Sequence, residues 1–317
     1  MLASLKFVQG AVAKKDFVPS LTHFRIANGR VMGYNGMLSL SGPIKMDLTA
    51  SPKAIPFVKA IQTCKETIAL HLTPTGRLSV RSGAFKAQVD CTADEFPEVS
   101  PSGEDVPLNG SILEVLKLLE PFIADDASRP WARGILFRGQ TAVATNNVII
   151  VEKWLGYTFP TAINIPRAAV LELIRIGEEP VRIQVDAVSA TFHYSGERWL
   201  RTQLFPPDWP DLSRILDVES SPIPPPDELW QAVTDLAPFT DDLGRIYFVP
   251  NKVATTATIE ESGASIELNL GVTAGCYNFK HLTLLEGVVD RIDLSSYPKA
   301  CIFYGNCLRG AIVGMRG

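Results

Sequence analysis

The stretch that decides the fold is SGAFKAQVDCTADEFPEV at residues 82–99, because it returns as SGERWLRTQLFPPDWPDL at residues 195–212. Each copy opens on Ser-Gly and places an aromatic-Pro-acidic-aliphatic tetrapeptide thirteen residues after the glycine. The two copies lie 113 residues apart. A fixed period of this length is typical of internal repeats, so it predicts a chain built from similar units.

Helical patterns recur at the same period on the amino-terminal side of these copies. They open at Pro52, Pro166 and Asn278. One apolar face is predicted for each: Ile55, Val58 and Ile61; Val170, Leu171 and Ile174; Leu282, Leu285 and Val288 or Val289. Alternating residues predict strands within 77–89, 181–194 and 265–270.

A second helical pattern supports the repeat. The tetrapeptide LEPF at residues 119–122 precedes Asp125-Asp126, and LAPF at residues 236–239 precedes Asp241-Asp242. The predicted order of elements in each repeat is therefore helix, strands, helix, strands. This order favours an α+β fold. Stretches rich in Pro, Ser and acidic residues at 101–105 and 220–226 mark boundaries. We expect three domains, at residues 1–107, 108–215 and 216–317.

Composition describes a globular protein with several cores. The chain has 317 residues, 46% of them apolar, and a net charge of −4. No apolar run reaches the ~20 residues of a membrane span, and the first fifteen residues lack the order of a signal peptide, so we expect a cytoplasmic protein with no membrane partner. The five cysteines form no C-x-x-C pair and the four histidines are scattered, so neither a metal nor a cofactor is expected.

Four stretches resemble one family, the sliding clamps of the bacterial DNA polymerase III beta-subunit type. Residues 165–175 are similar to the second helix of that family's middle domain, and residues 209–216 resemble its F-P-D-x-x-R-V-L segment. Residues 143–145 resemble the V-A-T that precedes D-G-H-R-L, and residues 313–316 resemble the M-P-M-R ending. The D-G-H-R-L stretch itself is replaced, and the shorter chain suggests a divergent or phage-encoded member.

The resemblance implies a DNA-clamp (processivity) fold, with two inner helices and outer antiparallel sheets in each repeated domain. It implies no active site. The function would be to encircle duplex DNA without sequence specificity and to tether the replicative DNA polymerase and other factors. The partners would be a second copy of the chain in a head-to-tail homodimer ring, double-stranded DNA, and short linear peptides of the polymerase and the clamp loader. A phage-encoded clamp would act in the host cytoplasm.

Basic residues are candidates for contact with DNA phosphates. Residues 1–66 carry nine Lys and Arg against three Asp and Glu. Lys15 matches an arginine that points into the ring in the family, and Arg129 and Trp131 match a loop that touches duplex DNA there. The full candidate set is Lys6, Lys14, Lys15, Lys53, Lys59, Arg129, Trp131, Arg167, Arg175 and Lys280. Ordinary solvated helix faces are the alternative for any single member.

The predicted domains also differ in charge. They carry +3, −1 and −6 in chain order. Opposite charges at the two ends of the chain favour head-to-tail pairing.

A partner-peptide pocket is expected where the resemblance brings the middle and C-terminal domains together. Its predicted residues are Thr145, Asn147, Ile150, Pro210, Ile215, Ala311, Val313 and Met315. Alternation in a terminal strand would place Ala311, Val313 and Met315 on one face, giving an apolar groove. Closure of the last domain's core is the alternative role for these side chains.

Two other functions remain open on the residues alone. The acidic pairs Asp125-Asp126 and Asp241-Asp242 could serve a metal-dependent hydrolase, although adjacent acids after a helix are more often turn or capping residues. A β-rich scaffold that binds proteins without encircling DNA is the other alternative.

Overall fold

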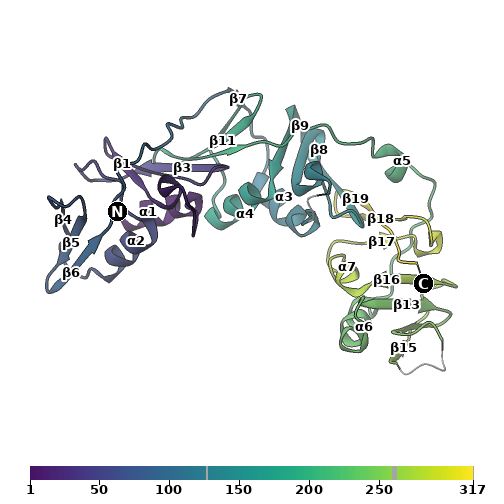
Figure 1. Ribbon diagram of the computed structural model, residues 1–317. Helices are drawn as coiled ribbons and strands as arrows, with labels where there is room; N and C mark the ends of the chain where they lie inside the picture. The colour runs from purple at the N-terminus through teal and green to yellow at the C-terminus, as the bar shows by residue number, and fades with distance from the viewer. Residues whose placement is uncertain (126–127, 259–262, 317) are drawn as a thin grey trace. The chain divides into compact units, whose positions relative to one another are not determined.

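The computed structural model describes residues 1–125, 128–258 and 263–316, which fold into two compact units (Figure 1). The first unit comprises Met1–Leu113 and Ala168–Phe205, and the second comprises Glu114–Arg167 and Pro206–Gly317. Each unit therefore joins two stretches that are far apart in the sequence. The chain passes the predicted boundaries at 107 and 215 just after strand β7 and within the short helix α5.

The first unit contains a seven-stranded antiparallel sheet in the order β1-β2-β3-β12-β11-β10-β7. Its strands are β1 (Arg25–Ala27), β2 (Arg30–Tyr34), β3 (Leu38–Pro43), β7 (Glu104–Val106), β10 (Arg182–Val185), β11 (Ser189–Tyr194) and β12 (Arg198–Gln203). At its centre β3 pairs with β12, and Leu40 lies opposite Leu200. Both leucines are fully buried. The sheet thus joins the first repeat to the middle repeat by backbone hydrogen bonds.

A smaller sheet of the first unit comes entirely from the first repeat. It has the order β4-β5-β6, with β4 (Ala69–Leu72), β5 (Leu78–Ser82) and β6 (Phe85–Val89). Gly83 has φ 55°, which suits the tight turn between β5 and β6. β4 is an edge strand of this sheet.

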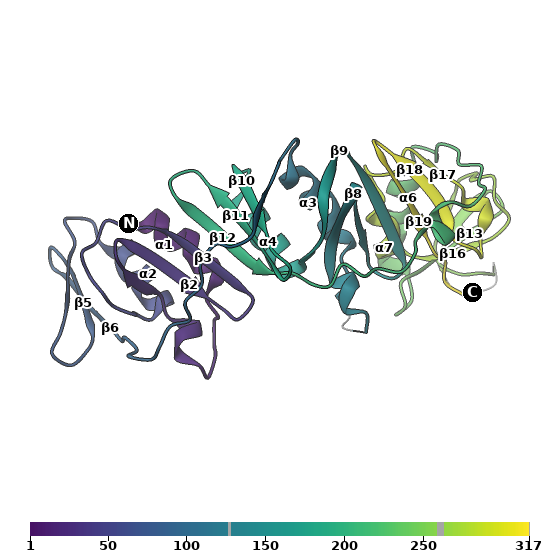
Figure 2. The ribbon, with the colours of Figure 1, turned by 90° about the horizontal axis from the view of Figure 1, so that it is seen from above.

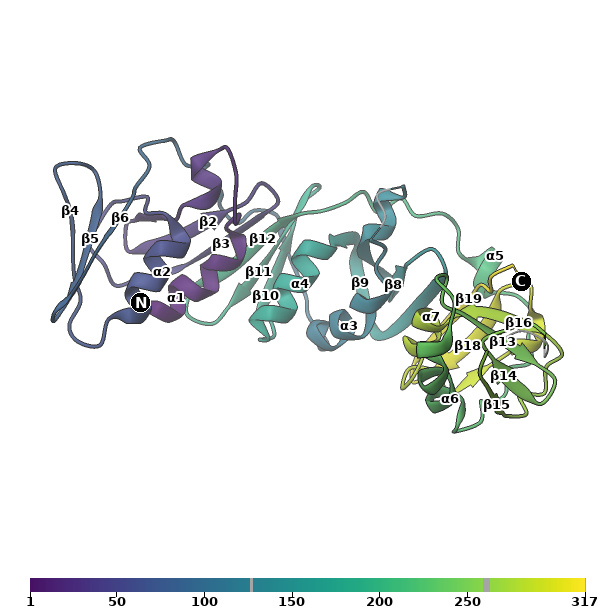
Figure 3. The same cartoon turned by 60° about the horizontal axis from the view of Figure 1, so that its bottom comes forward.

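Helices α1 (Leu2–Val8), α2 (Ala54–Thr63) and most of α4 (Arg167–Ile176) also belong to the first unit. α1 packs against α2 and β3, and Figure 3 shows α1 and α2 side by side. Phe57, Val58 and Ile61 of α2 are buried, which fits the 3.6-residue period. In α4 the buried face is Ala169, Val170 and Leu173, so the prediction that Leu171 faces the core is wrong.

The second unit contains a five-stranded antiparallel sheet in the order β17-β18-β19-β9-β8. Its strands are β8 (Gly134–Thr145), β9 (Ile149–Pro166), β17 (Arg291–Ile292), β18 (Cys301–Gly305) and β19 (Leu308–Ile312). β19 pairs with β9, and Ala311 lies opposite Ile150. This pairing joins the middle repeat to the last repeat, as β3 and β12 join the first two.

The last repeat contributes a four-stranded sheet and a helix pair, seen from above in Figure 2. The sheet has the order β15-β14-β13-β16, with β13 (Arg245–Val249), β14 (Lys252–Ala254), β15 (Ser265–Glu267) and β16 (Gly275–Asn278). The other α-helices of the described residues are α3 (Ile112–Leu119), α5 (Ser213–Leu216), α6 (Leu229–Leu236) and α7 (Phe279–Thr283). α6 packs against α7.

The stretches that the sequence marks as equivalent adopt the same local structure. α3 and α6 each end in a 3-10 turn that contains the repeated proline, at Glu120–Phe122 and Ala237–Phe239. The third predicted helix begins at Asn278, whose side chain accepts a hydrogen bond from the Lys280 N–H at 2.8 Å. It is shorter than its pattern suggests, and Val289 rather than Val288 is buried.

Candidate partner and nucleic-acid interfaces

A compact apolar cluster covers part of the five-stranded sheet in the second unit. Its buried members come from β8, β9, β18, β19 and residues 209–216: Leu136, Val143, Ile150, Trp209, Leu212, Leu216, Ile302 and Ala311. Register explains the grouping, because Ile302, Ala311, Ile150 and Thr145 pair in sequence across four adjacent strands. Antiparallel partners place their side chains on the same face of a sheet.

The segment that carries the repeated W-P-D-L tetrapeptide covers this row. α5 packs against β19, and Trp209 and Leu216 enter the cluster. The Trp131 ring lies 4.8 Å from the Trp209 ring, centroid to centroid, at an interplanar angle of 59°. The buried Trp209 indole N–H has no hydrogen-bond partner among the described residues.

The predicted pocket residues differ in burial. Ile150 and Ala311 are buried members of the apolar cluster, whereas Pro210, Ile215 and Val313 are exposed at the surface. Peptide binding at these residues stays a prediction.

The other predicted pocket residues take part in local hydrogen bonds or turns. Thr145 is buried, and its hydroxyl donates to the Ile149 carbonyl at 2.8 Å and accepts from the Asn147 N–H at 3.1 Å. Asn147 is exposed with φ 72°. The Met315 N–H donates to the carbonyl of Cys276, in β16, at 2.7 Å. The Met315 backbone is therefore held by the last repeat's own sheet.

Sequence reasoning missed six members of the cluster: Leu136, Val143, Trp209, Leu212, Leu216 and Ile302. A signal existed for part of the covering segment, because Trp209 and Leu212 belong to the tetrapeptide that recurs in the repeat. Leu136, Val143 and Ile302 depend on strand register, which the sequence does not display.

Arg309 of β19 links β9 to the segment after α5. Arg309 Nε donates to Glu152 Oε2 at 2.7 Å and Arg309 Nη1 donates to Asp217 Oδ1 at 2.5 Å. Burial lowers the pKa of Arg309, but these two carboxylates outweigh it and raise the pKa overall. The arrangement fixes the segment after α5 against β9 and β19.

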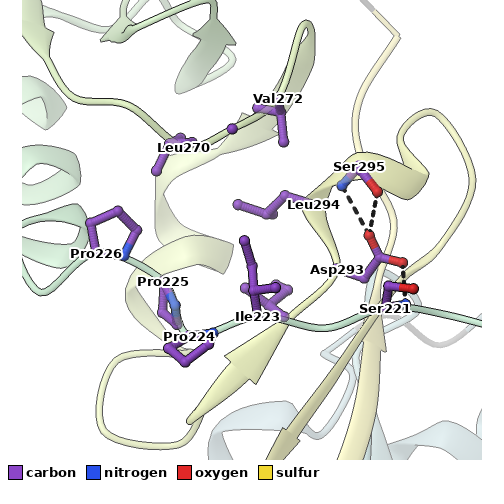
Figure 4. A pocket seen from close by; sticks show the side chains of 12 residues that line it. Ser221, Ile223, Pro224, Pro225, Pro226, Leu270, Val272, Asp293, Leu294 and Ser295 are labelled. Carbon is purple, nitrogen blue, oxygen red and sulfur yellow. Dashed lines mark hydrogen bonds between the residues drawn. The ribbon is translucent and has the colours of Figure 1, made fainter.

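A small apolar cavity lies on the last repeat (Figure 4). Ile223, Leu270 and Leu294 line it together with the prolines of residues 224–226. The Asp293 carboxylate beside it accepts hydrogen bonds from Ser295 and from the Ser221 N–H, so this acid holds the local structure together.

Most predicted DNA-facing cations are free of internal ion pairs. Within residues 1–125, 128–258 and 263–316, seven of them are exposed and form no salt bridge: Lys6, Lys14, Lys15, Lys53, Lys59, Arg129 and Lys280. Lys14 and Lys15 lie in the loop after α1, Lys53 caps α2, and Lys59 is in α2. Free charges of this kind remain available to phosphates.

The other predicted DNA contacts have partners inside the protein. Arg167 pairs with Glu120 at 3.2 Å and with Asp125. Arg175 pairs with Glu172 at 2.5 Å and donates to the Phe7 carbonyl at 2.9 Å. Trp131 is half-buried against the apolar cluster. Their DNA contact stays a prediction. In the structure, the two arginines form ion pairs and Trp131 packs against the apolar cluster.

The described members of the acidic pairs form ion pairs or lie at the surface. Asp241 pairs with Arg245 at 2.6 Å and accepts from the Arg245 N–H at 3.0 Å. Asp126 lies outside the described residues. In the described part of the chain, no three His, Cys, Asp or Glu side chains come together as metal ligands. Among the same residues, no helix is long and apolar enough to span a membrane.

The structure resembles solved bacterial sliding clamps over its whole length. The beta subunit from DNA polymerase of Streptococcus pyogenes matches with a TM-score of 0.81 at 15% identity, covering 100% of this chain and 97% of that chain. The DNA polymerase III subunit beta from Pseudomonas aeruginosa gives 0.80 at 18% identity with the same coverage. The Helicobacter pylori beta clamp bound to DNA ligase peptide gives 0.78 at 16%, covering 99% and 97%.

No family model and no curated protein matches the sequence. The likeness to solved structures establishes the fold. This chain has the α+β sliding-clamp fold with antiparallel sheets, which confirms the predicted fold class.

Proposed function

We propose that this chain is a sliding DNA clamp, a non-catalytic subunit that encircles duplex DNA and tethers a replicative polymerase. The observation that carries the proposal is the end-to-end match to bacterial beta clamps, which covers 100% of this chain at a TM-score of 0.81. As a replication factor it would act in the cytoplasm, or in the host cytoplasm if it is phage-encoded. Its three repeats would correspond to residues 1–107, 108–215 and 216–317.

Ring closure would repeat a junction that the chain already makes twice. β3 pairs with β12 and β9 pairs with β19, so each pair of successive repeats shares one sheet. The first and last repeats keep sheets with open edges, including β4 and β15. A head-to-tail contact between two copies would form further junctions and close a homodimeric ring.

Exposed apolar residues support this closure. Phe122 and Phe239 hold equivalent positions in the repeat, but Phe122 is 1% exposed, while Phe239 is 64% exposed. Leu243 is exposed near Phe239, and Leu72 is exposed on edge strand β4. In a dimer, the second copy would cover these side chains.

The proposed ring has a direct test in light scattering and negative-stain imaging. We expect a mass of twice 34.6 kDa and closed rings. Phe239→Asp with Leu243→Asp should give a folded monomer, and Val181→Asp, at an exposed position outside the predicted contact, is the matched control. A native protein that stays monomeric at micromolar concentration would contradict the proposal.

Partner peptides would dock on the apolar cluster and its exposed rim. The Helicobacter pylori clamp carries a DNA ligase peptide, and polymerase and clamp-loader peptides are the expected ligands here. Val148, which is partly exposed, stands where the family has a polar residue, so this groove should bind host-type peptides less tightly than is usual in the family. Calorimetry with clamp-binding peptides should give weaker binding to Ile215→Asp than to the native protein. Equal affinity would place the peptide site elsewhere.

A further inference from the structure

The loop between α1 and β1 exposes an aromatic ring that no other described part of the chain covers. Phe17 is 105% exposed, the highest value among the exposed large hydrophobic residues of the described structure. Val18 beside it is 51% exposed. A single exposed apolar residue is common, but a phenylalanine with no packing at all is not explained by the fold.

The backbone of this loop is held in place. The Ala13 N–H donates to the Leu21 carbonyl at 2.8 Å and closes the base of the loop. The Val18 N–H donates to Asp16 Oδ1 at 2.9 Å, and the Leu21 N–H donates to the Val18 carbonyl at 3.1 Å. The ring is therefore presented on an ordered turn, and Figure 2 shows this segment standing out from the neighbouring sheet.

The charges around the ring select the partner. Lys14 and Lys15 precede it, are exposed, and make no ion pair with any described residue. The intervening Asp16 uses its carboxylate to cap the turn. Cationic side chains next to a free aromatic ring are the combination that binds single-stranded nucleic acid, by phosphate contact and base stacking.

Duplex DNA would make little use of such a ring, because its bases are already stacked on one another. Unstacked bases occur where a primed duplex passes into single strand. We propose that Phe17 stacks on an unstacked nucleobase at such a junction, while Lys14 and Lys15 hold the adjacent phosphates. This inference rests on the proposed clamp function and assigns the loop a preference within it.

The test compares variants at Phe17 on two DNA probes. Phe17→Leu keeps an apolar side chain but removes the aromatic face, and Phe17→Trp keeps the face and adds a fluorescent indole. Fluorescence anisotropy would measure binding to a primed junction with a single-stranded overhang and to a blunt duplex of equal length. We expect Phe17→Leu to weaken junction binding about 10-fold and to leave duplex binding unchanged.

Three further measurements make the outcome decisive. The added indole emission of Phe17→Trp should be quenched by the junction probe and not by the duplex. Lys14→Glu with Lys15→Glu should weaken binding to both probes, and Val181→Ala, at an exposed site in the same unit, should change neither. Equal affinity of the native protein and Phe17→Leu for the junction probe would overturn the inference. An equal loss of affinity for the junction and the duplex would also overturn it. The clamp proposal is judged separately, by the closed ring and the dimer mass.

Discussion

Substitution of Arg175 can distinguish a side chain that binds DNA from one that stabilises the fold. Its guanidinium donates through Nε to Glu172 Oε2 at 2.8 Å, through Nη2 to Glu172 Oε1 at 2.5 Å, and to the Phe7 carbonyl at 2.9 Å. The hydrogen bonds to Glu172 raise the pKa of Arg175 in spite of its partial burial, and the bond to the Phe7 carbonyl connects α4 to α1. The Glu172 side chain is only 8% exposed, so it depends on this partner.

Arg175→Ala would leave the Glu172 carboxylate buried without its counter-ion. Breaking a buried ion pair costs about 3–5 kcal/mol. Because the Arg175 side chain is 45% exposed, solvent would screen part of that loss. We therefore expect the free energy of unfolding to fall by about 2–3 kcal/mol, and the melting temperature of the first unit to fall by about 5–10 °C.

Thermal and urea unfolding, followed by circular dichroism, would measure the change. Adding Glu172→Gln to Arg175→Ala removes the stranded charge and should restore part of the loss. Lys59→Ala is the matched control, because Lys59 is exposed on α2 and makes no ion pair in the described structure. If Arg175→Ala melted like the native protein but bound DNA less tightly, the structural reasoning would be refuted.

Three other predictions follow from single contacts. Burial raises the pKa of Asp186, but hydrogen bonds from Ser102, Ser189 and the Val188 N–H lower it from 3.8 to about 2. The stability it contributes is therefore complete above about pH 4 and is lost as pH falls towards about 2, and Asp186→Asn should flatten acid unfolding over that range by about 2 kcal/mol. Trp131→Ala should reduce the free energy of urea unfolding by about 2 kcal/mol, because the half-buried indole covers the apolar cluster; an unchanged midpoint would mean that the ring packs on nothing. Gly103→Ala should cost more than about 2 kcal/mol in the same assay, because φ is 102° and a Cβ would lie 2.3 Å from the Val185 carbonyl, and a native-like midpoint would count against this conformation.

The fold could be predicted because its sequence signals are local and repeated. The prolines of residues 119–122 and 236–239 end two helices in the same way, and residues 77–89 form two strands around Gly83. Helix length was harder to predict. The apolar pattern after Asn278 continues to Val289, but the α-helix ends at Thr283.

The candidate site was only partly predictable. Ile150 and Ala311 belong to the buried cluster, and their contact with a peptide stays a prediction. Leu136, Val143 and Ile302 depend on which strands pair. The paired residues of β9 and β19 lie about 160 residues apart in the chain, beyond what a local pattern can specify. The same limit explains Arg167, whose carboxylate partner Glu120 lies on an earlier segment.

The two shared sheets also constrain the order in which the chain can fold during synthesis. β3 leaves the ribosome long before its partner β12, because residues 114–167 of the second unit are made in between. At ~5–20 residues per second, the edge of β3 stays unpaired for several seconds or more. β9 waits similarly for β19. Neither unit can be completed from a contiguous nascent segment, so chaperone protection of exposed strand edges should matter more for this chain than for a string of independent domains.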